Sequence, residues 1–296
     1  MQGGVAHVMD FVATVVIEVL YAIASLALIS IGLAIIFGMM RVINFAHGEF
    51  LMLGGYAAVL PTHIGINLWF SMLVIAPVSV GLFGIFIERL IIRPLYGRIV
   101  ETVLATWGLS LLLIGVVSSV IGFYQEGAAP PFGSVQVGAY HISIYTFFVI
   151  AVTAAILVGV YLFLKFTHYG LIAQGTMQNA AMASALGVNV DRVYAVTFGL
   201  GAALSGLAGA ILAPISGITP IIGITYIAKA FIVVVAGGVT VLAGTTVAAG
   251  LFGSISQLVT FATTPIIGEV ALLATAIVLL RLLPQGITGR FFRSGL

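Results

Sequence analysis

Runs of apolar residues long enough to cross a lipid bilayer recur along almost the whole chain. The first extends from Phe11 to Gly38, well beyond the ~20 residues that a membrane-spanning helix needs. Charged residues make up only 6% of the 296 residues, against roughly 25% in soluble domains. A soluble fold could not cover its surface with so few charges. The sequence therefore predicts an all-α integral membrane protein, folded as a polytopic helix bundle.

Nine apolar segments can be counted. They are 11–38, 50–60, 68–87, 102–121, 143–164, 194–213, 227–236, 245–261 and 266–283. Their continuous apolar character favours helices, because the strands of a membrane β-barrel alternate apolar and polar residues. The second and seventh segments are short enough to be half-helices, so we expect about eight to nine spans, some of them broken. No linker interrupts the series, and residues 1–296 are predicted to form a single transmembrane domain.

The distribution of basic residues predicts the topology of the chain. Three arginines lie in the short loop 88–101, which places this loop in the cytoplasm. Lys165 and Arg192 flank the polar interval 165–193 and place it on the same side, as further arginines do for the C-terminus. The N-terminus lacks Lys and Arg before its first apolar run, so we expect a retained first helix that starts outside.

Arg41, Asn44, His47 and Glu49 form a compact polar cluster within an otherwise apolar stretch. At membrane depth each of these groups costs free energy unless it has a partner, a cavity or an interface. Gly48 lies inside the cluster, and we expect the helix to break there. Two interpretations stay open: the last three side chains cap the broken helix, or they line or gate the path of a polar solute. Arg41 is expected to reach the cytoplasmic interface.

Two pairs of adjacent glycines and one lysine complete the candidate translocation pathway. The pairs Gly54–Gly55 and Gly237–Gly238 each lie inside a predicted apolar helix, a weak internal similarity that a repeated transporter fold could produce. Lys229 is an isolated charge in an apolar segment. It is expected either to pair with a carboxylate or a helix C-terminus, or to take part in the pathway.

Nothing in the sequence indicates catalysis. The G-x-S-x-G, HExxH and Walker A patterns are absent, and the chain has no cysteine. His47 and Glu49 are two residues apart, a spacing that does not place them on one helical face. A net charge of +2 gives no case for nucleic acid. We predict a non-enzymatic chain without catalytic residues, metal site or cofactor of its own.

The interval 165–193 is the longest polar part of the chain. Asn179 to Leu186 is predicted to be a short helix, which Gly187 ends as a left-handed residue. Alanines give this helix little bulk, so it could fit into a groove of a cytoplasmic partner. A free loop at the membrane interface is the alternative interpretation.

Six segments of the sequence resemble one family of bacterial membrane proteins. They are GLAIIFGMMRVINFAHGEFLMLGGY, ERLIIRPLYGR, GTMQNAAMASALGVNVDRV, SGLAGAILAPISGITPIIG, KAFIVVVAGGVTVLAGT and LLPQG. In this order they are similar to the permease subunits of ATP-binding-cassette (ABC) importers for branched-chain amino acids, urea and short amides. The resemblance covers nearly the whole chain.

The resemblance implies a type II-like permease fold in the bacterial inner membrane. The implied partners are a second, homologous permease in a heterodimer, two cytoplasmic ATPase subunits that bind ATP and magnesium, a periplasmic solute-binding protein and membrane lipid. It also implies that 165–193 is the cytoplasmic coupling loop. The residues expected to contact the ATPase are Gly175, Asn179, Ala180, Ala181, Ala185 and Gly187.

The resemblance leaves the solute open. Residues 95–113, the MQN of the coupling loop and LLPQG look more like the urea and short-amide branch, which we rank first. KAF at 229–231 looks more like the branched-chain amino acid branch, which we rank second. A stand-alone secondary transporter and a passive urea or water channel are the alternatives from other classes.

Overall fold

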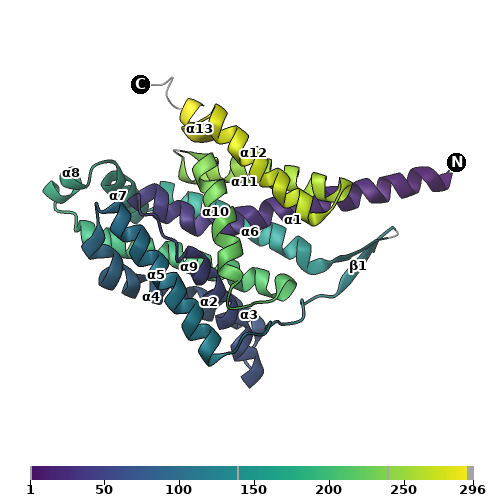
Figure 1. The fold of residues 1–296 in the computed structure, drawn as a ribbon, viewed down its shortest axis with the longest axis horizontal. Coiled ribbons are helices and arrows are strands. Elements are labelled where there is room, and N and C mark those ends of the chain that lie inside the picture. Colours follow the sequence, from purple (N-terminus) through teal and green to yellow (C-terminus); the bar gives the residue numbers. More distant parts are fainter. Residues whose placement is uncertain (1, 139, 239, 292–296) are drawn as a thin grey trace. The chain divides into compact units, whose positions relative to one another are not determined.

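The computed structural model describes residues 2–138, 140–238 and 240–291. Its α-helices are α1 (Gln2–Met40), α2 (His47–Val59), α3 (Leu68–Phe70), α4 (Ala76–Ile87), α5 (Ile99–Val120), α6 (Ile144–Phe166), α7 (His168–Gln178), α8 (Ala180–Ala185), α9 (Val190–Ser216), α10 (Ile222–Gly237), α11 (Val241–Ala262), α12 (Pro265–Leu282) and α13 (Gly286–Phe291). Strands β1 (Ser134–Val137) and β2 (Tyr140–Ser143) form an antiparallel hairpin. Figure 1 shows these elements along the chain.

The helical architecture confirms the predicted polytopic membrane protein. Within the described residues, seven helical segments are long and apolar enough to cross a membrane. Helix α10 is apolar but shorter, and α2 has only 13 residues. These two helices correspond to the two segments that the sequence predicts to be half-helices. The hairpin β1–β2 lies mainly between the predicted apolar segments 102–121 and 143–164, and its last residue is the first residue of the second of them.

The described residues divide into two compact units. Unit 1 comprises 2–28, 129–156 and 232–291, and unit 2 comprises 29–128 and 157–231. Within unit 1, α11 packs against α12 and α13, as Figure 1 shows. Gly253 of α11 lies against the backbone of Ile23 in α1, so that α1 and α11 approach closely.

Helix α9 is the central helix of unit 2, with α2 and α4 packed along it. Small residues allow this close packing, as is common between helices in membranes. Gly54 of α2 faces the backbone of Gly206, and Gly209 of α9 faces the backbone of Leu51. A Cβ atom on either glycine would collide with that backbone. The repeated small residues of 199–210 therefore serve helix packing.

The segment from Leu68 to Leu95 is one long helical path with two π-turns. In each turn an N–H bonds to the carbonyl five residues before it, from Ala76 to Ser71 and from Arg93 to Glu88. A proline follows each of these donors, at positions 77 and 94. Because a proline ring clashes with the carbonyl four residues before it, the wider turn relieves that clash. The second π-turn places Glu88 in the interior of unit 2.

Candidate functional site

The polar cluster of the sequence lies where the helical path is interrupted between α1 and α2. Residues 41–46 are non-helical, and Arg41 has a φ of 52°, which is unusual for a residue other than glycine. The expected break at Gly48 is therefore wrong. Gly48 lies in the first turn of α2, where its Cα faces the backbone of Gly223 in α10. It serves a close approach of two helices, a contact between distant residues that local sequence does not reveal.

His47 is completely buried and joins three elements of unit 2. Its Nε2 lies 2.8 Å from the carbonyl of Ile29 in α1, and its Nδ1 lies 3.1 Å from the hydroxyl of Ser205 in α9. A carbonyl only accepts, so Nε2 carries the proton and Nδ1 is the acceptor for Ser205. The Ser205 hydroxyl also lies 2.8 Å from the carbonyl of Gly201, so its single proton is shared between that carbonyl and Nδ1. Both ring nitrogens are thus used in holding α2 against its neighbours. The expectation that His47 caps a helix end is wrong, and its geometry supports a structural role.

Replacing His47 with alanine is expected to lower the free energy of unfolding by about 2 kcal/mol or more, because two buried hydrogen bonds are lost. The Ser205→Ala variant should lose less, because the bond from Nε2 of His47 to the carbonyl of Ile29 remains. Thermal unfolding of the purified variants measures both effects. A His47→Ala protein that melts like the unmodified chain would contradict the structural role.

Asn44 and Glu49 are as deeply buried as His47, but their polar atoms are not fully used. Their side chains are 0% and 1% exposed. The Oδ1 atom of Asn44 accepts from the N–H of Ala46 at 3.0 Å, so Asn44 caps locally, whereas its Nδ2 has no hydrogen-bond partner among the described residues. Neither carboxylate oxygen of Glu49 has a hydrogen-bond partner among the described residues, although Ser110 of α5 and Gly223 of α10 lie beside the carboxylate. Buried polar atoms without partners are costly and are often found at functional sites.

The other predicted pathway residues lie in both units. In unit 2, Gly54 and Gly55 face Gly206 and Ile218, and Lys229 is half-buried in α10. The structure thus gives both glycines a packing role.

In unit 1, Gly237 ends α10 and packs against Gly244 of α11. Gly238 follows α10 with a φ of 84°. The two glycine pairs therefore differ in structure, because only Gly54–Gly55 lies inside a helix. Gly244 lies in the first turn of α11, where its small size allows the contact with Gly237.

The polar interval after α6 contains the predicted short helix. Helix α8 follows Asn179, whose side chain accepts from the N–H of Met182 at 2.9 Å. Gly187 has a φ of 85°, its N–H bonds to the carbonyl of Ser184, and the next N–H bonds to that of Ala183. This pattern is a Schellman motif with glycine at C′. The helix and its terminal glycine are confirmed, while α7, which precedes them, was not predicted.

The exposed surface of α8 is more apolar than the sequence suggested. Ala181 and Ala185 are exposed, Ala180 is half-buried and Ala183 is buried. Met182 and the adjoining Leu186 are 58% and 77% exposed. Their spacing of four residues in an alanine-rich helix is the signal that could have identified them. At Gly175 of α7 a Cβ would meet no neighbour, so packing within the chain does not require glycine there.

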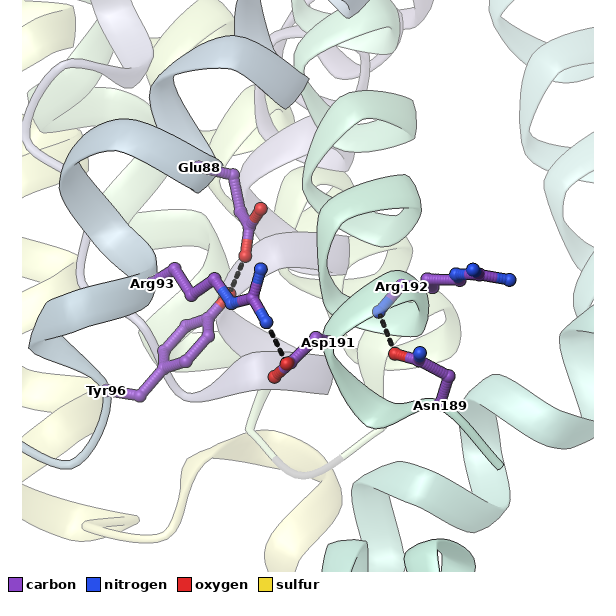
Figure 2. Close-up of polar contacts among 6 residues, drawn as sticks. All are labelled: Glu88, Arg93, Tyr96, Asn189, Asp191 and Arg192. Atoms are coloured by element: carbon purple, nitrogen blue, oxygen red, sulfur yellow. Dashed lines mark hydrogen bonds and ion pairs between the residues drawn. The ribbon is translucent and has the colours of Figure 1, made fainter. Parts of the chain in front are cut away.

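An ion pair connects the start of α9 with the end of the 68–95 path. Arg93 pairs with Asp191 in the first turn of α9, as Figure 2 shows. Asn189 caps α9 by accepting from the N–H of Arg192 at 3.0 Å. Both partners of the ion pair are about half exposed, so the pair contributes at most about 1 kcal/mol to stability. Its consequence is positional: the residues that follow α8 are linked to the 88–96 segment.

A buried carboxylate lies next to this ion pair. The hydroxyl of Tyr96 donates to Oε1 of Glu88, which is completely buried (Figure 2). Burial raises the pKa of Tyr96 far above its ordinary range, and the hydrogen bond to Glu88 adds to the rise. The phenol therefore keeps its proton and remains a donor at physiological pH. This hydrogen bond joins the two ends of the 88–96 segment.

A metal-binding arrangement is not found in the part of the chain that the structure describes. No group of three or more His, Cys, Asp or Glu residues there is placed to hold a metal ion. The geometry instead offers two features: buried, unpartnered polar atoms at the start of α2, and a capped, exposed helix α8 linked to the 88–96 segment.

Comparison with known proteins gives a consistent result. The sequence model of a family described as "Branched-chain amino acid transport system / permease component" matches residues 15–283. The high-affinity branched-chain amino acid transport system permease protein LivH of Salmonella typhimurium is 31% identical over 209 residues, covering 65% of this chain and 67% of the relative. LivH of Escherichia coli K12 is 30% identical, and BraD of Pseudomonas aeruginosa 29% identical, with the same coverage. No solved structure matches.

Proposed function

This chain belongs to the family of permease components of branched-chain amino acid transport systems, and on that premise we propose that it carries branched-chain amino acids into the cell. It is a multi-pass inner-membrane permease subunit of the ABC importer type. The family match over 15–283 is the observation that carries the proposal. It also disfavours a stand-alone secondary transporter or a passive channel.

The relatives determine the proposed solute. Those named above are permeases for branched-chain amino acids. The order inferred from sequence, which put urea and short amides first, is not supported by them. We therefore place leucine, isoleucine and valine first. The partner solute-binding protein is expected to select among solutes, because the small-residue helices of this chain offer few polar groups that could recognise one.

The proposed assembly contains ATPase subunits that bind ATP and magnesium, an external solute-binding protein and a second, homologous permease in a heterodimer. We place the N-terminus outside, and the C-terminus and the 165–193 interval in the cytoplasm. Helix α8, with exposed Met182 and Leu186, is the proposed contact with an ATPase. The ion pair between Asp191 and Arg93 would transmit a movement of α8 to the helical segment 68–95.

Affinity purification from native membranes tests the assembly. A tag on this chain should retain ATPase subunits and a second permease. Calorimetry of the binding protein encoded with them should show binding of leucine, isoleucine or valine, and no binding of urea or acetamide. Purification of a transport-competent chain without an ATPase would contradict the assembly, whereas tight binding of urea would contradict only the solute.

We propose that Asn44 and Glu49 contribute to the translocation step. Nδ2 of Asn44 and both carboxylate oxygens of Glu49 have no hydrogen-bond partner among the described residues, so they could bind a solute when the helices part. Glu49→Gln and Asn44→Ala should reduce uptake several-fold and leave the preference between leucine and urea unchanged. The control is Ser71→Ala, because the Ser71 hydroxyl is also a buried polar group without a hydrogen-bond partner in the described chain. It should transport normally. A switch of preference in either variant would contradict this assignment.

A further inference from the structure

Unit 2 contains a cavity of about 230 Å³ between α1, α6, α7 and α9. Its wall is predominantly apolar and includes Ile35, Met39, Phe163, Leu164, Leu200 and Leu204. The polar cluster at the start of α2 does not line it. The cavity is thus separate from the residues proposed for translocation.

The few polar groups of the cavity wall are already used within the chain. The hydroxyl of Tyr169 donates to the carbonyl of Val193 at 2.9 Å. It also lies 3.4 Å from the hydroxyl of Thr197. An amino acid or a nucleotide would need hydrogen-bond partners that this wall does not supply. The occupant that fits is therefore an apolar chain.

The residues next to the cavity resemble the boundary between acyl chains and head groups. Lys165, directly after the cavity residues of α6, is exposed. Its Nζ donates to the hydroxyl of Tyr161 at 2.8 Å and lies 5.2 Å and 5.5 Å from the ring centroids of Tyr161 and Phe166. Tyrosine and lysine at the end of an apolar helix are typical of the membrane interface. One turn further into the helix, the cavity lies at the depth of acyl chains.

We propose that this cavity binds one acyl chain of an anionic phospholipid, whose head group is held by Lys165. An ammonium group has three donors, and the hydrogen bond to Tyr161 uses only one of them. The negative head group provides the complementary charge, and the acyl chain makes van der Waals contacts with the apolar wall of the cavity. The exposed apolar side chains of Val158 and Leu162 lie on the same helix and extend the apolar surface.

The position of the cavity suggests what the lipid does. Tyr169 and Ala173 of α7 form part of its wall, and α7 leads directly into α8. A bound acyl chain would support α7 against α1 and α9 and so fix the position of α8. This consequence rests on the proposed function of α8, whereas lipid binding itself does not.

Gly159 provides a specific way to block the cavity. It lines the cavity, and a Cβ there would meet no neighbouring atom, so a phenylalanine can fill the space without a clash of its Cβ. Gly115 of α5 is an exposed helical glycine with equally open space and does not line the cavity. Gly159→Phe and Gly115→Phe are therefore a matched pair.

The test uses the complete transporter in nanodiscs that contain phosphatidylglycerol or phosphatidylcholine with a photoreactive acyl chain. Phosphatidylglycerol should label the 159–173 peptides, Gly159→Phe should reduce this labelling at least tenfold, and Gly115→Phe should not. Lys165→Gln should bring the labelling by the two lipids to the same level.

Three results would overturn the proposal: labelling that persists in Gly159→Phe, an equal loss in Gly115→Phe, or a neighbouring subunit that crosslinks to the 159–173 region in place of lipid. Because labelling is read without transport, it can fail while the importer function stands. If the unmodified transporter shows lipid labelling of the 159–173 peptides but no ATP-dependent uptake, only the importer function is contradicted.

Discussion

Gly54→Ala and Gly209→Ala are each expected to destabilise the protein by about 1–3 kcal/mol or more, although alanine is the better helix former. Each added methyl would collide with backbone atoms of the facing helix, Gly206 in one case and Leu51 in the other. Backbone atoms cannot rotate away as a side chain can, so α2 and α9 must separate. Since α9 is the central helix of unit 2, we expect a large loss of folded protein.

Thermal unfolding and size-exclusion profiles of the purified variants measure this effect. The control is Gly115→Ala in α5, where a Cβ meets no neighbour. It should be neutral or stabilising by up to about 1 kcal/mol, because alanine reduces the freedom of the unfolded chain. The three substitutions are chemically identical, so a common melting temperature would contradict the packing described for α2 and α9.

The second large effect is expected at α8. Ala181→Trp and Ala185→Trp add bulk to its exposed surface, where a tight contact with an ATPase would be overpacked at a cost of about 1–3 kcal/mol, roughly a tenfold loss of occupancy or more. Gly187→Val should act similarly, because a β-branched residue is strained at a φ of 85°. All three should lose solute-stimulated ATPase activity in reconstituted vesicles, or lose the ATPase subunits.

The membrane fold of these variants should remain intact, because α8 is a six-residue helix with few contacts in the rest of unit 2. Ala155→Trp, at an exposed position of α6, controls for the presence of a tryptophan and should keep normal activity. If the interval 165–193 is instead a free loop at the membrane interface, uptake and ATPase activity should be normal in every variant. That outcome would show that α8 does not dock.

Local signals in the sequence predicted those parts of the structure that local forces determine. Long apolar runs predicted the membrane helices, since little else satisfies backbone groups in lipid. Asn179 and Gly187 predicted both ends of α8, because capping involves only neighbouring residues. The prolines at 77 and 94 were present in the sequence, but their effect on the helical path, a π-turn, was not anticipated.

Contacts between distant residues were beyond local reasoning. Sequence alone predicts a helix break at Gly48, whereas the role of this residue depends on its contact with Gly223, far along the chain. His47 was grouped with Asn44 and Glu49 by proximity in sequence, and only its bonds to α1 and α9 distinguish it as structural. The buried polar cluster therefore could be identified from sequence, while the packing role of His47 required the structure.

Uptake of radiolabelled leucine into vesicles tests the central proposal most directly. The vesicles contain this chain, its second permease and the ATPase subunits, with the binding protein outside and ATP enclosed. Leucine should accumulate above its external concentration only when ATP and the binding protein are both present. Uptake that proceeds without ATP, or that stops when the internal and external concentrations are equal, would contradict an ATP-driven importer.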